Sequence, residues 1–317
     1  MSAAVHSLDH FSLVVPDLAA ASSFYTTFGL HVQQRGSDCN LHAANGPHRW
    51  GRVREGAAKA LDYISFGAYD GDLPSFRERL RARGIAELRP PASALDDTGI
   101  WFQDADGIVV EIRVGPKVSP EAKAAALATS SPAGVAAAPL RANAPVIRPR
   151  RLSHVLLFTS NVARAVEFYR DALGLALSDA AGDDIAFMHA VHGSDHHVVA
   201  FARSDARGFH HCSWDVASVN DVGQGAMQMA DAGYSAGWGL GRHVLGSNYF
   251  HYVRDPWGSY SEYSHDIDYI SADGAWQASH VTPDNGFYLW GPPPPADFAF
   301  NYESPSAELS RDLRSSV

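Results

Sequence analysis

The sequence contains the same pattern twice, and this repeat constrains the fold more than any other feature. The segment LDHFSLVVPDLAAASSFYTTFGL begins at residue 8, and LSHVLLFTSNVARAVEFYRDALGL begins at residue 152. The two copies align His10 with His154. Each predicts a strand, an Asp or Asn near a helix start, a helix, and a glycine at the helix end. The chain is therefore expected to form two similar halves.

A finer repeat lies inside each half. The segments LDYISFGAYD and FHHCSWDVAS resemble the two opening strands, and they place Tyr63 and His211 at the positions of His10 and His154. Each is followed by a helical pattern. The repeat predicts four β-α-β-β-β modules, two in each half, which pair because a single module cannot bury its faces alone. The predicted fold class is α+β, not a doubly wound parallel sheet.

The repeat and the composition together suggest domain boundaries. We expect an N-terminal domain over residues 1–115 and a second domain over residues 151–285. Between them, residues 116–150 are rich in Ala and Pro without a sustained apolar period, which is typical of a linker. Residues 286–317 are expected to form a C-terminal tail.

Charge and cysteine content exclude several functions. The formal net charge of −10 disfavours nucleic acid and anionic membrane surfaces as partners. No apolar run is long enough to span a bilayer, and no secretory signal is visible. The two cysteines, Cys39 and Cys212, form no C-x-x-C pattern, so a disulfide framework is not expected. These features predict a cytoplasmic protein.

Three residues of the second half are candidates for a metal site. His154 and His211 occupy equivalent positions on the first strands of two modules, and Glu262 lies on the last strand of the second. If the modules pair symmetrically, the two histidines face each other across a cleft and Glu262 completes a triangle. Taken singly, a histidine on a strand is more often an ordinary core or surface residue. Their joint placement favours a ligand set of two imidazoles and one carboxylate, as in non-haem Fe(II) oxygenases.

The first half serves as an internal comparison. The segment IWFQDADGIVVEI matches HYVRDPWGSYSEY and places Glu111 at the position of Glu262. His10 is also present, but Tyr63 takes the position of the second histidine. We therefore expect a degenerate metal site in the N-terminal domain.

The second half resembles the catalytic domain of type I extradiol ring-cleavage dioxygenases, in the vicinal oxygen chelate superfamily. The resemblance lies in LSHVLLF, HHVVAF, FHHCSW and GRHVLGSNYFHYVRDPWGSYSEY, the last at residues 241–263. It extends over essentially the whole chain. It implies two glyoxalase/bleomycin resistance-like domains, of which the first has lost its metal site.

The resemblance also implies roles for individual residues. The implied ligands of Fe(II), or less often Mn(II), are His154, His211 and Glu262. His197 matches the acid–base histidine of the family, while His243 and Tyr252 match donors that contact bound substrate. His189 is a candidate substrate-binding residue, at a position where other members often carry an aromatic side chain.

Two adjacent histidine pairs leave the assignment open on physical grounds. Neighbouring residues of a strand point to opposite faces, so only one of His196 and His197, and one of His210 and His211, is expected to face the cleft. The family spacing favours His197 and His211.

The implied function is cleavage of a catechol-type ring by dioxygen at a mononuclear Fe(II) centre, giving a hydroxymuconic semialdehyde-type product in aromatic compound degradation. Alternatives are another metalloenzyme of the superfamily, such as a glyoxalase-like lyase or isomerase, and a non-catalytic small-molecule binding protein. The predicted partners are a catecholic substrate, dioxygen and further copies of the chain. The aromatic and proline-rich segment NGFYLWGPPPPADFAFN is expected either to pack as a strap or to cover the cleft.

Overall fold

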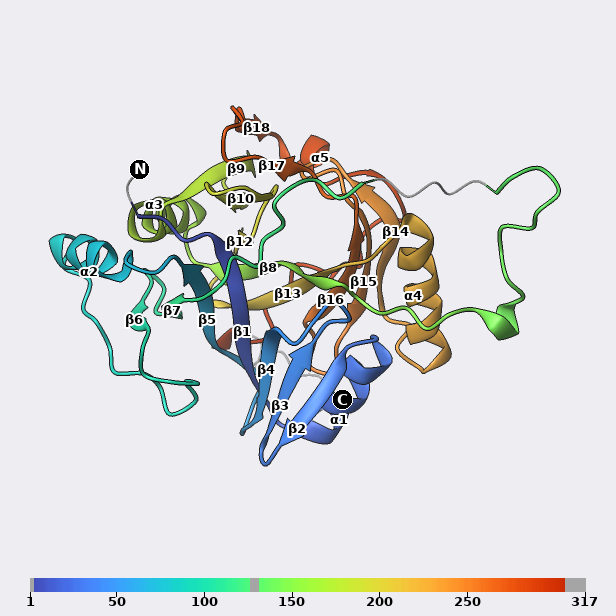
Figure 1. The fold of residues 1–317 in the computed structure, drawn as a ribbon, viewed down its shortest axis with the longest axis horizontal. Helices are drawn as coiled ribbons and strands as arrows, with labels where there is room; N and C mark the ends of the chain where they lie inside the picture. The colour runs from blue at the N-terminus through green and yellow to red at the C-terminus, as the bar shows by residue number, and fades with distance from the viewer. Residues whose placement is uncertain (1–2, 126–130, 306–317) are drawn as a thin grey trace.

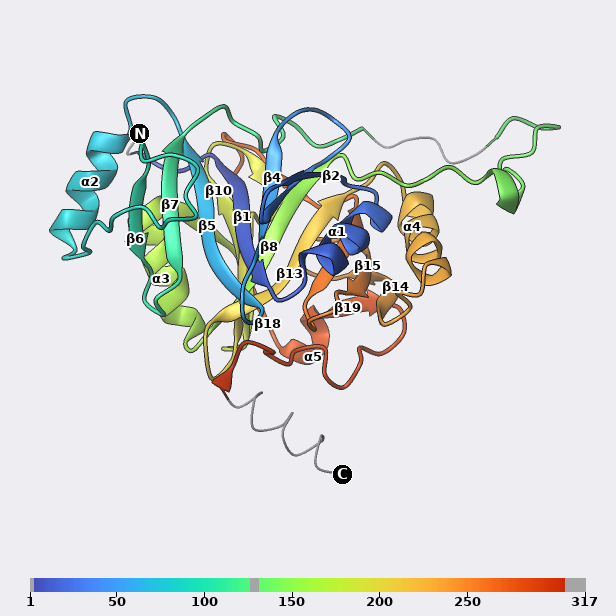
Figure 2. The ribbon, with the colours of Figure 1, turned by 90° about the horizontal axis from the view of Figure 1, so that it is seen from below.

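The computed structural model describes residues 3–125 and 131–305. The predicted linker and the predicted tail therefore fall partly outside the described residues. Within the described ranges, most strands belong to two large sheets, which lie against each other (Figure 1). Figure 2 shows the same arrangement from below.

The first sheet and its two helices come from the N-terminal half. Its strands are β1 (Ser7–Val15), β2 (His31–Arg35), β3 (Asp38–His42), β4 (Arg49–Glu55), β5 (Ala60–Ala68), β6 (Ile100–Gln103) and β7 (Val109–Val114), and its helices are α1 (Leu18–Thr27) and α2 (Leu73–Ala82). The strand order is β2-β3-β4-β1-β5-β7-β6. Strands β1 and β5, which begin the two modules, are antiparallel neighbours at the centre.

The second sheet repeats this plan with additions at both edges. Its strands are β8 (Arg151–Thr159), β9 (Leu175–Ala181), β10 (Ile185–Ala190), β12 (Val199–Arg203), β13 (Gly208–Asp215), β14 (Gly237–His243), β15 (Tyr249–Arg254), β16 (Tyr260–His265), β18 (Ser279–Val281) and β19 (Tyr288–Trp290). The order is β18-β9-β10-β12-β8-β13-β16-β15-β14-β19. The remaining elements are helices α3 (Val162–Leu173), α4 (Val219–Asp231) and α5 (Pro283–Gly286), the 3₁₀ helix η1 (Arg141–Asn143), and the paired short strands β11 (Ser194–Asp195) and β17 (Tyr269–Ile270).

The expected β-α-β-β-β module is found, with one shortened copy. In the described part of the chain, the module that begins with β5 has two strands after its helix instead of three. A single bridge between Leu88 and Trp101 stands where the missing strand would lie. Pro90 and Pro91 lie two and three residues after Leu88. Proline cannot donate a ladder hydrogen bond, so strand pairing stops there.

The helix ends agree with the sequence signals. The side chains of Asp17 and Asn161 accept hydrogen bonds from the third backbone N–H that follows each of them, and so cap α1 and α3. Helix α3 ends at Gly174, whose φ of 76° lies in the left-handed region that glycine tolerates. Capping fixes where each helix leaves its strand and therefore how it packs on the sheet.

The two halves share one continuous apolar core. Phe28 of the N-terminal half stacks on Tyr263 of the second half at a ring separation of 3.9 Å, and the Tyr263 hydroxyl donates to the Phe28 carbonyl. Phe11 of the N-terminal half likewise contacts Phe209 and Trp214 of β13. The N-terminal sheet thus backs the strand β13 that carries a candidate ligand. Among the described residues, no helix has the length and apolar character needed to cross a membrane.

Candidate metal centre

Three neighbouring central strands carry the candidate ligands. His154 lies on β8, His211 on β13 and Glu262 on β16, and β13 is hydrogen-bonded to both of the other strands. Ser213 of β13 lies opposite His154 on one side and Glu262 on the other. All three candidate side chains are buried. The histidines are therefore neighbours within one sheet, a closer arrangement than the predicted one across a cleft.

The ligand atoms of these residues converge on one point. The Nε2 atom of His154 lies 3.4 Å from Oε2 of Glu262, and Nε2 of His211 lies 3.8 Å from the same oxygen. One ligand atom from each residue lies within 4.8 Å of the other two. Among the described residues, His211 Nε2 and Glu262 Oε2 have no hydrogen-bond partner although both are buried. Unpaired buried polar atoms are costly, so this donor set fits a bound cation.

Other side chains hold the ligands in place. The Nδ1 atom of His154 lies 3.3 Å from the Ser153 hydroxyl, which donates to Asp195 at 2.7 Å. The other Glu262 oxygen, Oε1, accepts a 3.0 Å hydrogen bond from the Asn248 amide. Partners of this kind fix the orientation of a ligand and leave its metal-facing atom free.

Each of the four modules carries a β-bulge directly before its key residue. In the register of the central strand pairs, the extra residues are Asp9, Asp62, Ser153 and His210. A bulge breaks the alternation of side chains between the two faces of a strand. Three of the four bulged side chains turn to the ring of the following histidine and contact its Nδ1 atom.

The bulge at His210 corrects one expectation. Simple alternation predicted that only one of His210 and His211 would face the cleft, but both line the same cavity. Their Nδ1 atoms lie 2.7 Å apart, and His210 Nε2 lies 2.7 Å from the carbonyl oxygen of Phe298. His210 is therefore a direct neighbour of the candidate ligand.

The second histidine pair is arranged differently. His197 lines the cavity, and its ring lies 3.9 Å from that of His154. Its Nδ1 atom lies 3.0 Å from Nδ1 of His196, whose Nε2 lies 2.7 Å from Asp179 Oδ2. A carboxylate only accepts, so His196 donates to Asp179 from Nε2, and with this single ring proton its Nδ1 accepts from His197. Burial, and then the nearby His154, lower the pKa of His197 well below its usual range.

His243 and Tyr252 form a hydrogen-bonded pair beside Glu262. The His243 Nδ1 atom lies 2.8 Å from the Phe287 carbonyl, so it carries the proton, and Nε2 accepts from the Tyr252 hydroxyl at 2.9 Å. The same Nε2 lies 3.9 Å from Glu262 Oε1. Burial, and then the Glu262 carboxylate, raise the pKa of Tyr252 well above the usual value, so its phenol stays neutral.

A cavity of about 760 Å³ opens beside the three candidate ligands. Its wall is largely apolar and aromatic, and includes Leu156, Ile185, Phe187, Leu245, Phe287 and Phe298. The chain after α5 supplies one side of it, and Phe298 also packs on Trp238 and Tyr252. The proline-rich segment thus packs as a strap and borders the cavity at the same time. A cavity with this wall accepts a flat, largely apolar molecule with its polar end toward the ligand cluster.

Comparisons with known proteins agree with this geometry. The family model of the Glyoxalase/Bleomycin resistance protein/Dioxygenase superfamily matches residues 7–112 and 151–263. The chain belongs to this superfamily.

The relatives within the superfamily include ring-cleavage enzymes. The chain is 52% identical over 301 residues to metapyrocatechase 2 of Cupriavidus necator, which covers 95% of this chain and 93% of that protein. The Mn(II)-bound glyoxalase from Novosphingobium aromaticivorans superposes with a TM-score of 0.74 at 25% identity, over 96% of this chain and 99% of that one. The halotolerant catechol dioxygenase BphC superposes with a TM-score of 0.73 at 21% identity, over 92% of this chain and 95% of that one. The predicted fold class and the predicted family resemblance are confirmed.

The cavity and the ligand cluster involve His189 and Asn248 in ways that the sequence did not predict. His189 is absent from the wall of the cavity formed by the described residues; its Nδ1 atom lies 2.8 Å from the hydroxyl of Ser178, the bulged residue of β9. Phe187, two residues earlier, lines the cavity instead. His189 thus lies outside this wall, and its contact with substrate stays a prediction. Asn248, which holds Glu262, was not predicted, because a single asparagine in a loop carries no distinguishing pattern.

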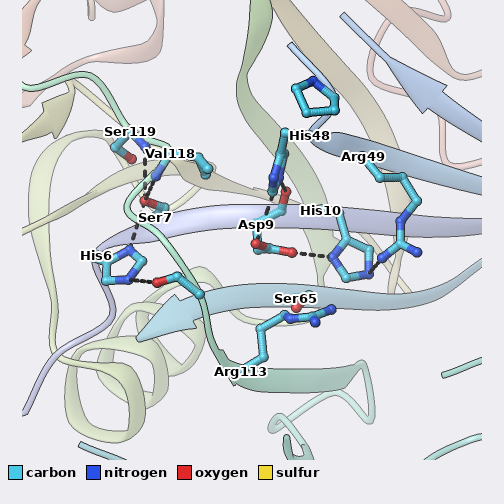
Figure 3. Close-up of polar contacts among 12 residues, drawn as sticks. His6, Ser7, Asp9, His10, His48, Arg49, Ser65, Arg113, Val118 and Ser119 are labelled. Atoms are coloured by element: carbon cyan, nitrogen blue, oxygen red, sulfur yellow. Dashed lines mark hydrogen bonds and ion pairs between the residues drawn. The ribbon is translucent and has the colours of Figure 1, made fainter. Parts of the chain in front are cut away.

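The N-terminal domain holds the equivalent site in a closed form. His10 Nδ1 lies 2.6 Å from Asp9, and His10 Nε2 is contacted by the Tyr63 hydroxyl at 3.0 Å and by the Arg49 guanidinium at 3.2 Å. Figure 3 shows His10 between Asp9 and Arg49. Glu111 points elsewhere and accepts a 2.5 Å hydrogen bond from Ser65. The metal-facing nitrogen is thus already occupied by protein donors.

The register identifies the counterpart of His197 in this domain. Gly51 pairs with Phe11, the residue after His10, just as Val199 pairs with Val155, the residue after His154. Counting back two positions from each places Arg49 at the position of His197. A guanidinium is permanently charged, so it repels a metal cation and accepts no proton.

Proposed function

We propose that this protein is an extradiol dioxygenase that opens the ring of a catechol-type substrate with dioxygen at a mononuclear Fe(II) centre. The product would be a hydroxymuconic semialdehyde-type compound formed during aromatic degradation. The observation that carries the proposal is the convergence of three buried ligand atoms, two of them unpartnered, beside an aromatic cavity. The 52% identity to a metapyrocatechase supports it.

In this proposal, His154, His211 and Glu262 hold the metal. Two imidazoles and one carboxylate form the ligand set of non-haem Fe(II) oxygenases, and the glyoxalase with a similar fold is Mn(II)-bound, which supports manganese as the alternative metal. Bound Fe(II) would lower the pKa of the catechol hydroxyls and allow electrons to pass from the ring to dioxygen. The surrounding residues orient the substrate and move its protons.

His197 is proposed as the acid–base residue. Its lowered pKa keeps the imidazole neutral near pH 7, and its Nδ1 proton is directed to His196. The lone pair on Nε2 is therefore available to accept a proton from a substrate hydroxyl in the cavity. The same proton can return to an oxygen of the opening ring, so His197 ends the cycle neutral.

Tyr252 and His243 are proposed to position the substrate oxygens. Both line the cavity next to Glu262, and the neutral phenol of Tyr252 has a hydroxyl that can turn between His243 and the substrate. The aromatic wall, with Phe187 and Phe298, would pack on the faces of the substrate ring and exclude water.

We also propose that the enzyme works in the cytoplasm as a homo-oligomer. Cys39 and Cys212 are free and buried, in keeping with a reducing compartment. Light scattering on the purified protein measures its subunit number.

One experiment separates the candidate functions. Anaerobic protein is loaded with Fe(II), mixed with catechol and then exposed to air. We expect a yellow ring-fission product and the uptake of one dioxygen per ring opened. Absence of both with a panel of catechols would exclude the proposal, and turnover of a glutathione or other thiol adduct without oxygen uptake would identify a glyoxalase-like enzyme. Metal-free protein that binds catechol unchanged would point to a binding protein.

A further inference from the structure

We propose that His210 is a positioning residue through which the C-terminal tail fixes the tautomer of the metal ligand His211. This inference rests on the proposed function, because it concerns the same metal site. It assigns a role to a histidine that the family resemblance left aside, and to a carbonyl group 87 residues beyond the ligand in the sequence.

The first step concerns the hydrogen bond between His210 and the tail. His210 Nε2 lies 2.7 Å from the carbonyl oxygen of Phe298. A carbonyl oxygen only accepts, so the proton of this bond belongs to His210 Nε2. A neutral imidazole carries one N–H, and His210 is buried among the rings of Phe158, Tyr260 and Phe298. Its Nδ1 atom is therefore an acceptor.

The second step concerns the ligand itself. His211 Nδ1 lies 2.7 Å from His210 Nδ1. Since the His210 atom accepts, His211 must donate from Nδ1, which leaves a lone pair on its Nε2. That Nε2 is the buried atom without a partner, 3.8 Å from Glu262 Oε2. The tail carbonyl thus selects the tautomer in which His211 presents a lone pair to the metal.

In the described part of the chain, the other histidine ligand, His154, has no such link to the tail. His154 Nδ1 contacts Ser153, and Ser153 donates to Asp195, which also receives hydrogen bonds from Arg151 at 2.5 and 3.1 Å. All four residues belong to β8 and β11 of the same domain. Changes in the tail should therefore act on the ligand His211 and not on the ligand His154.

Ion pairs hold the tail carbonyl in place from both sides. Asp297, directly before Phe298, receives two hydrogen bonds from Arg254 at 2.6 and 2.7 Å. Further along, Glu303 contacts Lys59 of the N-terminal half and accepts from the backbone N–H of Phe209 at 2.9 Å. Phe209 directly precedes His210. The tail therefore holds the start of β13 and the carbonyl that His210 needs.

The test measures metal affinity, not turnover. Metal-free protein is titrated with Mn(II), and free Mn(II) is followed by its electron paramagnetic resonance signal. His210→Phe keeps a ring in the aromatic cluster but removes the acceptor for His211, so we expect Mn(II) affinity to fall about 10- to 100-fold. His210→Asn should recover most of it, because its Oδ1 can accept from His211 Nδ1. The matched control, His251→Phe, changes a half-buried histidine of the same sheet and should bind like wild type.

A second pair of variants tests the tail. Asp297→Ala should weaken Mn(II) binding several-fold in the wild-type background, because the Phe298 carbonyl loses its anchor. In the His210→Asn background the same change should have a much smaller effect, since the acceptor no longer depends on the tail. Equal effects in both backgrounds would contradict the link.

The outcomes separate this inference from the proposed function. If wild-type protein binds Mn(II) and Glu262→Ala abolishes binding, but His210→Phe binds normally, the role of His210 is wrong and the metal site stands. If Glu262→Ala binds as tightly as wild type, the proposed function fails first. Circular dichroism and the melting temperature of each metal-free variant show whether it folds. Should His210→Phe not fold, the two Asp297→Ala backgrounds decide the question.

Discussion

The two domains place equivalent side chains at equivalent points of the same fold, yet among the described residues only the second domain brings three ligand atoms together as a candidate metal site. In the second domain, His154, His211 and Glu262 leave two buried atoms without partners. In the N-terminal domain, His10 Nε2 is contacted by Tyr63 and Arg49. The fold therefore supplies positions, whereas the residues at two or three of them decide between a metal site and a closed polar network.

The bulges make the comparison sharper. Asp9 and His210 are both bulged residues that contact the Nδ1 atom of the next histidine. The same orienting contact is therefore present in the N-terminal domain, whose described residues form no candidate metal cluster. The two domains differ on the other side of the histidine ring, where Tyr63 and Arg49 contact His10 Nε2 in the N-terminal domain.

The largest expected effect comes from removing the carboxylate of each domain in turn. Glu262→Ala should abolish iron retention after gel filtration, because it removes the anionic member of the ligand set. Glu111→Ala should leave the iron content unchanged, because Glu111 bonds to Ser65 and not to His10. Iron content is measured colorimetrically. Iron retained by Glu262→Ala, together with catechol cleavage, would refute the assignment.

The next effect concerns the acid–base position and its counterpart. His197→Phe should keep the metal but lower catechol turnover by about 10²- to 10⁴-fold, the range typical of a lost general acid–base group. Arg49→Gln, at the equivalent place in the N-terminal domain, should leave turnover within about twofold. Oxygen uptake and metal content are measured on both proteins. Full activity of His197→Phe would sink its proposed role.

A smaller effect is expected on stability. Burial raises the pKa of Glu111 to about 7, well above that of an unfolded glutamate. A raised pKa means that stability is fully present below the unfolded pKa near 4.3 and is lost as pH rises through about 7. Between pH 5 and pH 9, the free energy of unfolding of Glu111→Gln should therefore rise relative to that of wild type, by on the order of 3 kcal/mol at most.

Urea unfolding of both proteins at pH 5 and pH 9 checks this expectation. The control is Glu87→Gln, at an exposed glutamate, which should show no such pH-dependent gain. If the difference between Glu111→Gln and wild type is the same at both pH values, Glu111 does not titrate in this window.

The smallest expected effect is the most informative about the lost site. Tyr63→His restores a second histidine to the N-terminal domain, but Arg49 still faces His10 and Glu111 still bonds to Ser65. We expect no second equivalent of Mn(II) to bind. Isothermal titration measures the stoichiometry, and two equivalents would show that residue 63 alone closed the site.

The sequence was sufficient for much of the fold because its signals are local. The repeat, the helix caps at Asp17 and Asn161 and the glycine at 174 lie within a few residues of the elements that they define. The convergence of His154 with Glu262 was also within reach, because the same repeat fixes which strands are central. The shortened module was missed, since Pro90 and Pro91 interrupt a strand that the repeat predicted.

The sequence by itself determined the modules, the α+β class and the residues that can form a metal site, because spacing along the chain and module symmetry were enough. Tertiary structure alone decided that His210 and His211 line the same cavity, and that Phe187 lines it while His189 does not. It also decided that Phe298 of the tail both borders this cavity and contacts His210. A bulge arises from the register between two strands, and a cavity wall arises from segments distant in sequence. Neither is written in the spacing of any one segment, so both appear only when the strands have paired.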